Sequence, residues 1–311
     1  MPRIKANGLE IEYEETGSAD DPMILLISGY MGQMTEWPDS FKQALADAGR
    51  RVVTFDNRDI GLTTATDDPG LEEIVPPPME ALMQGAAEGA PVHEQVPYVL
   101  DDMAADAAAL IEALGAEQAD ILGLSMGGMI VQLMALNHPE RVRTLIPVMT
   151  TSGDPELPPS DPEALEALTA EPEADTLEAI GDLAVQTYHV IGSHPDIRNP
   201  DEELRAAAMA DVQRANRPSG LARQFSALLA QPRWHDRLGT VTHPTLVLHG
   251  AVDRLINPEG GRDIARRIPN AEFEIIEKWG HDLPEKVVPA LLNRIIPFLG
   301  RTAPSGPAHA D

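Results

Sequence analysis

The first half of the chain alternates two patterns of hydrophobic and polar residues, one typical of strands and one of helices. Leu9, Ile11 and Tyr13 recur at every second position after the turn Asn7-Gly8, which predicts a hairpin. Continuous apolar runs follow, of the kind found in strands buried on both faces of a parallel sheet. These runs are Met23–Ser28, Val52–Phe55, Ile121–Leu124 and Thr144–Val148.

Helical spacing separates these runs. Phe41, Leu45 and Ala48 recur at i, i+4 and i+7, and Gly49 stands where a helix C-terminus favours glycine. Similar patterns cover Leu100–Leu114 and Met126–Leu136. Strands and helices in alternation are typical of βαβ units, so the sequence predicts the α/β class: a mostly parallel sheet flanked by helices on both faces.

The alternation stops after Gly153, and helical patterns continue without a strand to about Gln231. Strand signals return at Thr245–His249 and Glu272–Ile276, before a last amphipathic helix. We therefore expect a helical cap inserted into an α/β core. The predicted cap helices are Thr176–Ile191, Asp201–Asn216 and Gly220–Leu229. The predicted divisions are a core of residues 1–152 and 232–300, a cap of residues 153–231 and a disordered tail of residues 301–311. The segment 67–97 is either a second lid element or a surface loop.

Composition and charge narrow the possible functions. With 23 Lys+Arg against 50 Asp+Glu, the net charge of −27 excludes a nucleic-acid partner, since phosphate backbones bind basic surfaces. The acidity reflects either salt adaptation or plain solubility. The chain has no Cys, which excludes a thiol nucleophile, a disulfide framework and a thiolate metal site. It has no apolar run of about 20 residues and no signal-peptide core near Met1–Gly8, so we expect a cytoplasmic protein without a membrane partner.

The strongest chemical signal is Gly123-Leu124-Ser125-Met126-Gly127, between a predicted strand and a predicted helix. This is the arrangement of a nucleophile elbow, in which a strained turn exposes the serine and small flanking residues let the backbones pass. The alternative is an ordinary serine in a tight turn. The position at a strand end favours the elbow, so Ser125 is the predicted nucleophile.

A serine nucleophile needs an imidazole to take its proton and an acid to orient that imidazole. His281 follows the last predicted strand and so lies at the same sheet edge as Ser125. Asp253 follows the preceding strand, and the order Ser, Asp, His is that of α/β-hydrolases. Asp154, after an earlier strand, is the alternative acid. For His249, a packing or supporting role is expected, and for Asp282, exposure or a loop hydrogen bond.

Two backbone N–H groups are predicted to stabilise negative charge on a substrate oxygen. One belongs to Met126 in the elbow. The other belongs to Tyr30, in the turn Ser28-Gly29-Tyr30-Met31-Gly32 after an early strand. No His, Asp or Glu group has metal-ligand spacing, so no metal or organic cofactor is expected.

The chain resembles the α/β-hydrolase superfamily over about Ile4–Met149 and Val241–Leu299, and within it bacterial carboxylesterases of the aclacinomycin methylesterase type. The matching motifs are Ser28-Gly29-Tyr30, Asp56-Asn57-Arg58-Asp59-Ile60-Gly61, Gly123-Leu124-Ser125-Met126-Gly127-Gly128, Asn137-His138-Pro139-Glu140-Arg141-Val142, Gly250-x-x-Asp253 and Gly280-His281. The resemblance implies an oxyanion role for Tyr30 and Met126 and a helical cap over the pocket. Ser28 departs from the pattern, because many relatives have His there.

These observations predict a serine carboxylesterase that acts on a small-molecule ester, as a monomer or homodimer. The alternatives are lactone hydrolysis, cofactor-free perhydrolysis or ligand binding by a receptor-like protein. Five residues are expected to line an apolar substrate pocket, although packing within the cap is the alternative for any one of them. They are Met31, Met83, Tyr188, Met209 and Phe225.

Overall fold

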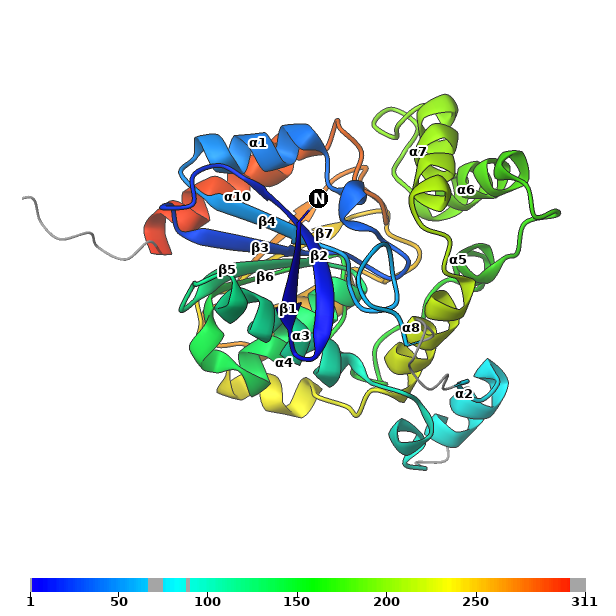
Figure 1. Ribbon diagram of the computed structural model, residues 1–311, viewed down its shortest axis with the longest axis horizontal. Coiled ribbons are helices and arrows are strands. Elements are labelled where there is room, and N and C mark those ends of the chain that lie inside the picture. The colour runs from blue at the N-terminus through cyan, green and yellow to red at the C-terminus, as the bar shows by residue number, and fades with distance from the viewer. Residues whose placement is uncertain (1, 67–74, 88–89, 303–311) are drawn as a thin grey trace, which may run out of the picture.

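A computed structural model describes residues 2–66, 75–87 and 90–302 of the chain. Its centre is an eight-stranded sheet of order β1-β2-β4-β3-β5-β6-β7-β8 (Figure 1). β1 (Arg3–Ala6) and β2 (Leu9–Thr16) form the predicted antiparallel hairpin, and β2 is also antiparallel to β4. The remaining pairs are parallel. The parallel strands are β3 (Met23–Ile27), β4 (Arg51–Phe55), β5 (Ala119–Leu124), β6 (Val142–Val148), β7 (Leu246–Gly250) and β8 (Glu272–Ile276).

Helices cover both faces of this sheet (Figure 1). On one face, α1 (Asp39–Asp47) and α10 (Val288–Thr302) bury Phe41 and Phe298 in a core that also holds Trp279. The other face is packed by α3 (Leu100–Ala113), α4 (Met126–Asn137) and α9 (Glu259–Arg267). The predicted α/β architecture is confirmed, and the carboxyl ends of the parallel strands meet at one edge.

Four helices follow one another between β6 and β7: α5 (Pro162–Thr169), α6 (Leu177–Ile191), α7 (Asp201–Arg214) and α8 (Pro218–Ala230). Figure 1 shows them gathered on one side of the sheet, together with α2 (Met79–Ala87). The sequence pattern predicted three of them but not α5. Helix α5 begins inside a proline-rich run, with Asp161 as its N-terminal capping residue. The Asp161 carboxylate accepts a hydrogen bond from the N–H of Glu163.

The segment between β4 and α3 contributes to this group of helices. Leu82 of α2 and Val92 are buried against Ala230 at the end of α8. Residues 67–74 and 88–89, which belong to the same predicted lid segment, lie outside the described residues. Short 3-10 helices complete the structure at Met34–Glu36 (η1), Val92–Gln95 (η2), Pro139–Arg141 (η3) and His235–Thr240 (η4).

The last helix extends further than its sequence pattern predicted. α10 passes through Gly300 and ends at Thr302, so two residues assigned to a disordered tail are helical. An ion pair of 2.6 Å between Arg301 and Glu272 of β8 fastens this final turn to the sheet. Residues 303–311, the rest of the predicted tail, lie outside the described residues.

Among residues 2–66, 75–87 and 90–302, no helix is both long and apolar enough to cross a membrane. Within the same ranges, no group of three or more His, Cys, Asp or Glu side chains is arranged to hold a metal ion.

Candidate active site

Ser125 lies in the turn between β5 and α4, where the backbone is strained. Its φ of 52° and ψ of −116° are unusual for a residue with a side chain. The turn is possible because of its glycines: a Cβ on Gly123 would lie 2.1 Å from the Gly127 carbonyl oxygen, and one on Gly127 would lie 2.2 Å from that of Ile27. The predicted elbow geometry is present, and it leaves the Ser125 side chain partly exposed.

The neighbouring strand holds this turn in place. The Ser125 N–H donates a hydrogen bond of 2.9 Å to the carbonyl of Val148, the last residue of β6. The Thr150 hydroxyl, two residues further on, donates a hydrogen bond of 2.7 Å to the Ser125 carbonyl. Both backbone groups of Ser125 are therefore satisfied, which lets a strained conformation persist.

His281 connects the serine to an acid. Its Nε2 lies 2.9 Å from Ser125 Oγ, and its Nδ1 lies 2.8 Å from Asp253 Oδ2. A carboxylate can only accept here, so Nδ1 carries the proton and Nε2 is free to accept one from the Ser125 hydroxyl. The backbone N–H of His281 also donates a hydrogen bond of 2.8 Å to the carbonyl of Ile191, at the end of α6. The structure thus brings together the three residues that the sequence predicted as a triad.

Asp253 is held as a carboxylate. Its Oδ1 accepts hydrogen bonds of 2.9 Å from the N–H groups of Leu255 and Ile256. Burial alone would raise the pKa of Asp253, but the adjacent His281 and His249 lower the pKa more strongly, to about 2. The acid is therefore ionised at neutral pH and able to orient the imidazole.

His249 supports this acid from within β7. The side chain is fully buried, and its Nε2 donates a hydrogen bond of 2.9 Å to the Ile256 carbonyl. The same nitrogen lies 3.3 Å from Asp253 Oδ2. This position agrees with the supporting role expected from the sequence, since His249 contacts the acid and not the serine.

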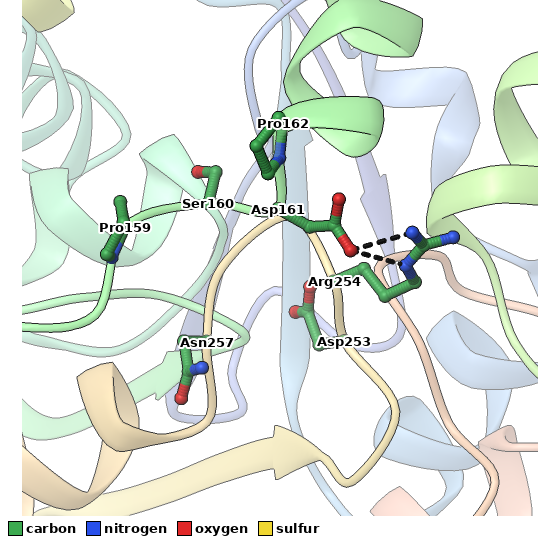
Figure 2. Close-up of a pocket in the computed structure, with 7 residues that line it drawn as sticks. All are labelled: Pro159, Ser160, Asp161, Pro162, Asp253, Arg254 and Asn257. Carbon is green, nitrogen blue, oxygen red and sulfur yellow. Dashed lines mark hydrogen bonds and ion pairs between the residues drawn. The ribbon is translucent and has the colours of Figure 1, made fainter.

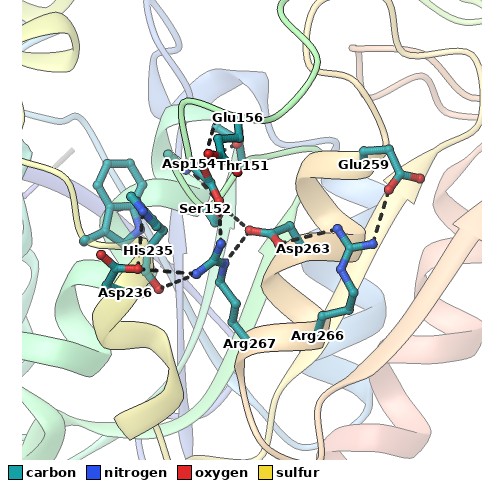
Figure 3. A network of polar contacts seen from close by, with 12 residues as sticks. Thr151, Ser152, Asp154, Glu156, His235, Asp236, Glu259, Asp263, Arg266 and Arg267 are labelled. Carbon is teal, nitrogen blue, oxygen red and sulfur yellow. Dashed lines mark hydrogen bonds and ion pairs between the residues drawn. The ribbon is translucent and has the colours of Figure 1, made fainter.

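Asp154, the alternative acid, is engaged elsewhere (Figure 3). Its carboxylate pairs with Arg267 of α9, which also binds Asp263 at 2.6 Å. Asp263 in turn accepts a hydrogen bond from the Ser152 hydroxyl. The network fastens the loop after β6 to α9, and the structure does not bring Asp154 to His281.

Asp282, next to the candidate base, is buried in a loop hydrogen-bond network. Its carboxylate accepts hydrogen bonds from the N–H of Ser193, at 3.0 Å, and from the hydroxyl of the same residue. Burial raises the pKa of Asp282, and the hydrogen bonds from Ser193 offset part of that rise. Of the two states expected from the sequence, the loop hydrogen bond is the one observed, and solvent exposure is not.

The turn after β3 reaches the serine, as predicted. A Cβ on Gly29 would lie 3.3 Å from Ser125 Cβ, so the peptide that leads to Tyr30 passes beside Ser125. The Tyr30 ring packs on Phe225 of α8 with 5.3 Å between ring centroids. The Met31 N–H donates a hydrogen bond of 3.4 Å to the Gln224 side chain. As the first residue of α4, Met126 carries an N–H that has no acceptor within its own helix.

The predicted pocket residues have different surroundings. Phe225 lies against Tyr30 beside the candidate oxyanion turn, and Met31 is 43% exposed. Tyr188 is partly buried on α6, where burial and then the nearby Glu36 raise the pKa of its phenol. Met209 instead packs between α7 and α6, since a Cβ on Gly181 would lie 3.4 Å from its Cγ. That is packing within the helical group, the alternative left open. The side chain of Met83, in α2, lies outside the described residues.

Sequence reasoning missed Glu36, which ends η1. Its Oε1 accepts a hydrogen bond of 3.3 Å from the Gly29 N–H, so a carboxyl group borders the turn that passes Ser125. Nearby, the Trp37 indole N–H donates to Ser28 Oγ at 3.2 Å. The sequence carried no signal for Glu36 beyond its distance of seven residues from Gly29, which matches no known motif.

An open cavity of about 440 Å³ lies between the residues that lead into α5 and the loop after β7; it is lined by Pro159, Ser160, Asp161, Pro162, Asp253, Arg254 and Asn257. An ion pair between Arg254 and Asp161 crosses it, with distances of 2.9 and 2.7 Å (Figure 2). Asp253 lines this cavity, but its side chain is fully buried and turned to His281. This cavity is therefore separate from the space around the Ser125 hydroxyl.

Comparison with known proteins agrees with this geometry. The model of the family described as having the alpha/beta hydrolase fold matches residues 22–286, and the chain belongs to this family. It is 27% identical to the rhodomycin D methylesterase DnrP of Streptomyces peucetius over 87% of this chain and 88% of that protein. The family, its resemblance to methylesterases and the predicted hydrolase class are confirmed.

Solved structures show the same fold. A hydrolase from Pseudomonas aeruginosa PA01 is 25% identical, with a TM-score of 0.67 over 96% of this chain and 97% of that one. The enol-lactonase from Burkholderia xenovorans LB400 is 21% identical, with a TM-score of 0.71 over 96% of this chain and 100% of that one. At this low identity the second likeness concerns the fold alone.

Proposed function

We propose that the protein is a serine carboxylesterase that hydrolyses small to medium carboxylic esters through an acyl-enzyme on Ser125. The observation that carries the proposal is the hydrogen-bonded series from Ser125 to His281 to Asp253, with distances of 2.9 and 2.8 Å. Ser125 itself lies in a strained turn at the edge of the sheet. The similarity to a methylesterase along most of both chains supports the same chemistry.

In the proposed reaction, Ser125 Oγ attacks the ester carbonyl while its proton passes to His281 Nε2. The N–H groups of Tyr30 and Met126 stabilise the negative charge that develops on the carbonyl oxygen. His281 then protonates the departing alcohol. A water molecule then attacks the acyl carbon and gives a proton to the same nitrogen. The bond to Ser125 Oγ breaks, the carboxylic acid leaves, and His281 returns the proton to Ser125 Oγ. Asp253 remains ionised throughout and stabilises the imidazolium.

We further propose that residues 153–231 act as a cap over Ser125, with segment 67–97 as an added lid element. Support comes from contacts between the helical group and the site: Phe225 packs on Tyr30, Gln224 binds the N–H of Met31, and the Ile191 carbonyl binds the N–H of His281. The packing of Leu82 against the end of α8 supports the role of the second segment. Such a cap would set the size of acyl or alcohol group that is accepted.

The proposed partner is a small-molecule ester. The charge of −27 makes a nucleic-acid partner unfavourable, because a strongly acidic surface repels a phosphate backbone. Lactones are cyclic esters that the same steps would open, so a substrate panel should hold a lactone beside linear aryl esters.

Replacing the nucleophile tests this proposal. We expect Ser125→Ala to abolish hydrolysis of 4-nitrophenyl butyrate and to leave circular dichroism and thermal unfolding nearly unchanged. A fluorescent organophosphonate should label the parent protein once, on the peptide that contains Ser125. Labelling of another residue, or full turnover by the variant, would contradict the proposed role.

A further inference from the structure

Glu36 places a carboxyl group beside the reacting atoms that the proposed triad does not use. Its Oε1 accepts from the Gly29 N–H at 3.3 Å, and a Cβ on the same Gly29 would lie 3.3 Å from Ser125 Cβ. Gly29 therefore lies between the Glu36 carboxyl group and Ser125. A Cβ on Gly32 would lie 2.5 Å from Glu36 Oε2, so the turn closes tightly around this side chain.

The groups around Glu36 are mostly neutral or acidic. One cation of α7, Arg214, lies near this turn, but it binds the Gln33 side chain and pairs with Asp56 at 2.8 Å. Ser28 at the end of β3 hydrogen-bonds with it, α7 contributes Asp211, and His281 approaches from the loop after β8. Tyr188 faces it from α6. Within the part of the chain that the structure describes, no Lys or Arg forms an ion pair with Glu36. Glu36 therefore lies among hydrogen-bonding and acidic groups and has no direct salt bridge among the described residues.

The ionisation of this group falls in an accessible pH range. Burial raises the pKa of Glu36 to about 7, although hydrogen bonds from Ser28 and Gly29 favour the charged form. Above that pH a carboxylate borders the turn beside Ser125, and below it the group is neutral. The side chain keeps some exposure to solvent, and its Oε1 is bound to the turn that passes Ser125.

We propose that Glu36 selects substrates by charge, disfavouring esters that carry a carboxylate near the reacting carbonyl and sparing neutral ones. The inference rests on the proposed ester hydrolysis at Ser125. Its physical basis is repulsion between two like charges in a partly desolvated space, where water screens them poorly. Such a repulsive element is one of the two general ways in which a site gains specificity.

Two pairs of matched esters test the proposal, each with an anionic and a neutral member. In the first pair the acyl group carries the charge: mono-4-nitrophenyl glutarate against 4-nitrophenyl pentanoate. In the second the alcohol carries it: 4-acetoxybenzoate against its methyl ester. The quantity measured is the ratio of kcat/KM for the anionic ester to kcat/KM for the neutral one. Protonation of His281 affects both members alike and cancels in this ratio.

We expect Glu36→Gln at pH 8.5 to raise this ratio about tenfold or more in at least one pair. The glutamine oxygen can still accept from the Gly29 N–H, so the turn keeps its hydrogen bond. The matched control is Glu203→Gln, which removes the same charge from an exposed position on α7 and should leave the ratio unchanged.

The pH dependence gives a second, variant-free measurement. In the parent protein the ratio should rise as the pH falls from 8.5 to 6, because Glu36 becomes neutral while a substrate carboxylate, with a pKa of about 4 to 5, stays ionised. In Glu36→Gln the ratio should stay flat. If that variant does not fold, the parent profile decides alone. A ratio independent of pH, or equal in parent and variant, overturns the inference, whereas absence of turnover of every neutral ester would overturn the esterase proposal instead.

Discussion

The strand-end site and the helical group α5–α8 are built by different kinds of interaction. Around Ser125, His281 and Asp253, much of the support comes from backbone groups at the ends of parallel strands, such as the N–H groups of Leu255 and Ile256 on the acid. The helical group is joined to the core largely through side chains. In particular, Arg223 of α8 forms a two-point ion pair of 2.9 Å with Asp59, and Arg214 of α7 pairs with Asp56 at 2.8 Å.

We interpret this difference as a division between the chemistry proposed at Ser125 and the substrate selection proposed for the helical group. Backbone support is shared by any sequence that folds into this sheet, so the positions of the reacting atoms tolerate change elsewhere. Side-chain anchors depend on particular residues, and Arg223 and Asp59 are almost completely buried, with side chains 2% and 0% exposed. We therefore expect substitutions in the first region to remove catalysis, and substitutions in the second to alter stability and substrate preference.

The largest effect should come from Asp253, the proposed acid. Asp253→Asn should lower kcat on 4-nitrophenyl butyrate by about 10⁴-fold with KM nearly unchanged, because an amide would hold His281 in the wrong tautomer. Asp154→Asn is the matched control and should change kcat by less than about threefold, since its carboxylate binds Arg267. Steady-state kinetics of the two variants, compared with the parent, makes the measurement. The reverse pattern would move the acid to the loop after β6.

The next effect concerns the anchor of α8. Arg223→Met should lower the free energy of unfolding by about 3–5 kcal/mol, because it leaves the buried Asp59 carboxylate without its cation. Arg205→Met should cost less than about 1 kcal/mol, since Arg205 pairs with the exposed Asp182. Urea unfolding of both variants at pH 8 gives the comparison. Equal losses would show that burial does not distinguish the two pairs.

The smallest effect distinguishes two residues within the helical group. Phe225→Ala removes the ring that packs on Tyr30, so kcat/KM should shift by about tenfold among acetate, butyrate and octanoate esters. Met209→Ala removes a packing contact between α6 and α7. It should lower the free energy of unfolding by about 1–3 kcal/mol and change kcat/KM for all three esters by the same factor. A uniform loss of rate in Phe225→Ala would place that ring in the packing of the helices and remove it from the pocket.

Local sequence patterns determined a large part of this protein. Alternation and apolar runs located the strands, and glycine spacing around Ser125 predicted the strained turn, because both depend on residues close together in the chain. The strand ends that carry Asp253 and His281 followed from the same pattern. Helix α5 and the end of α10 were missed or misplaced, since one begins inside a proline-rich run and the other passes through Gly300.

Only the tertiary structure decided which distant side chains meet. It paired Asp154 with Arg267 and gave His281 to Asp253, a choice that the sequence had left open. It also brought Glu36 beside Gly29 and His249 beside Asp253. The physical reason is that such contacts depend on how separate elements pack against one another, and the spacing of residues within each element carries no record of that packing.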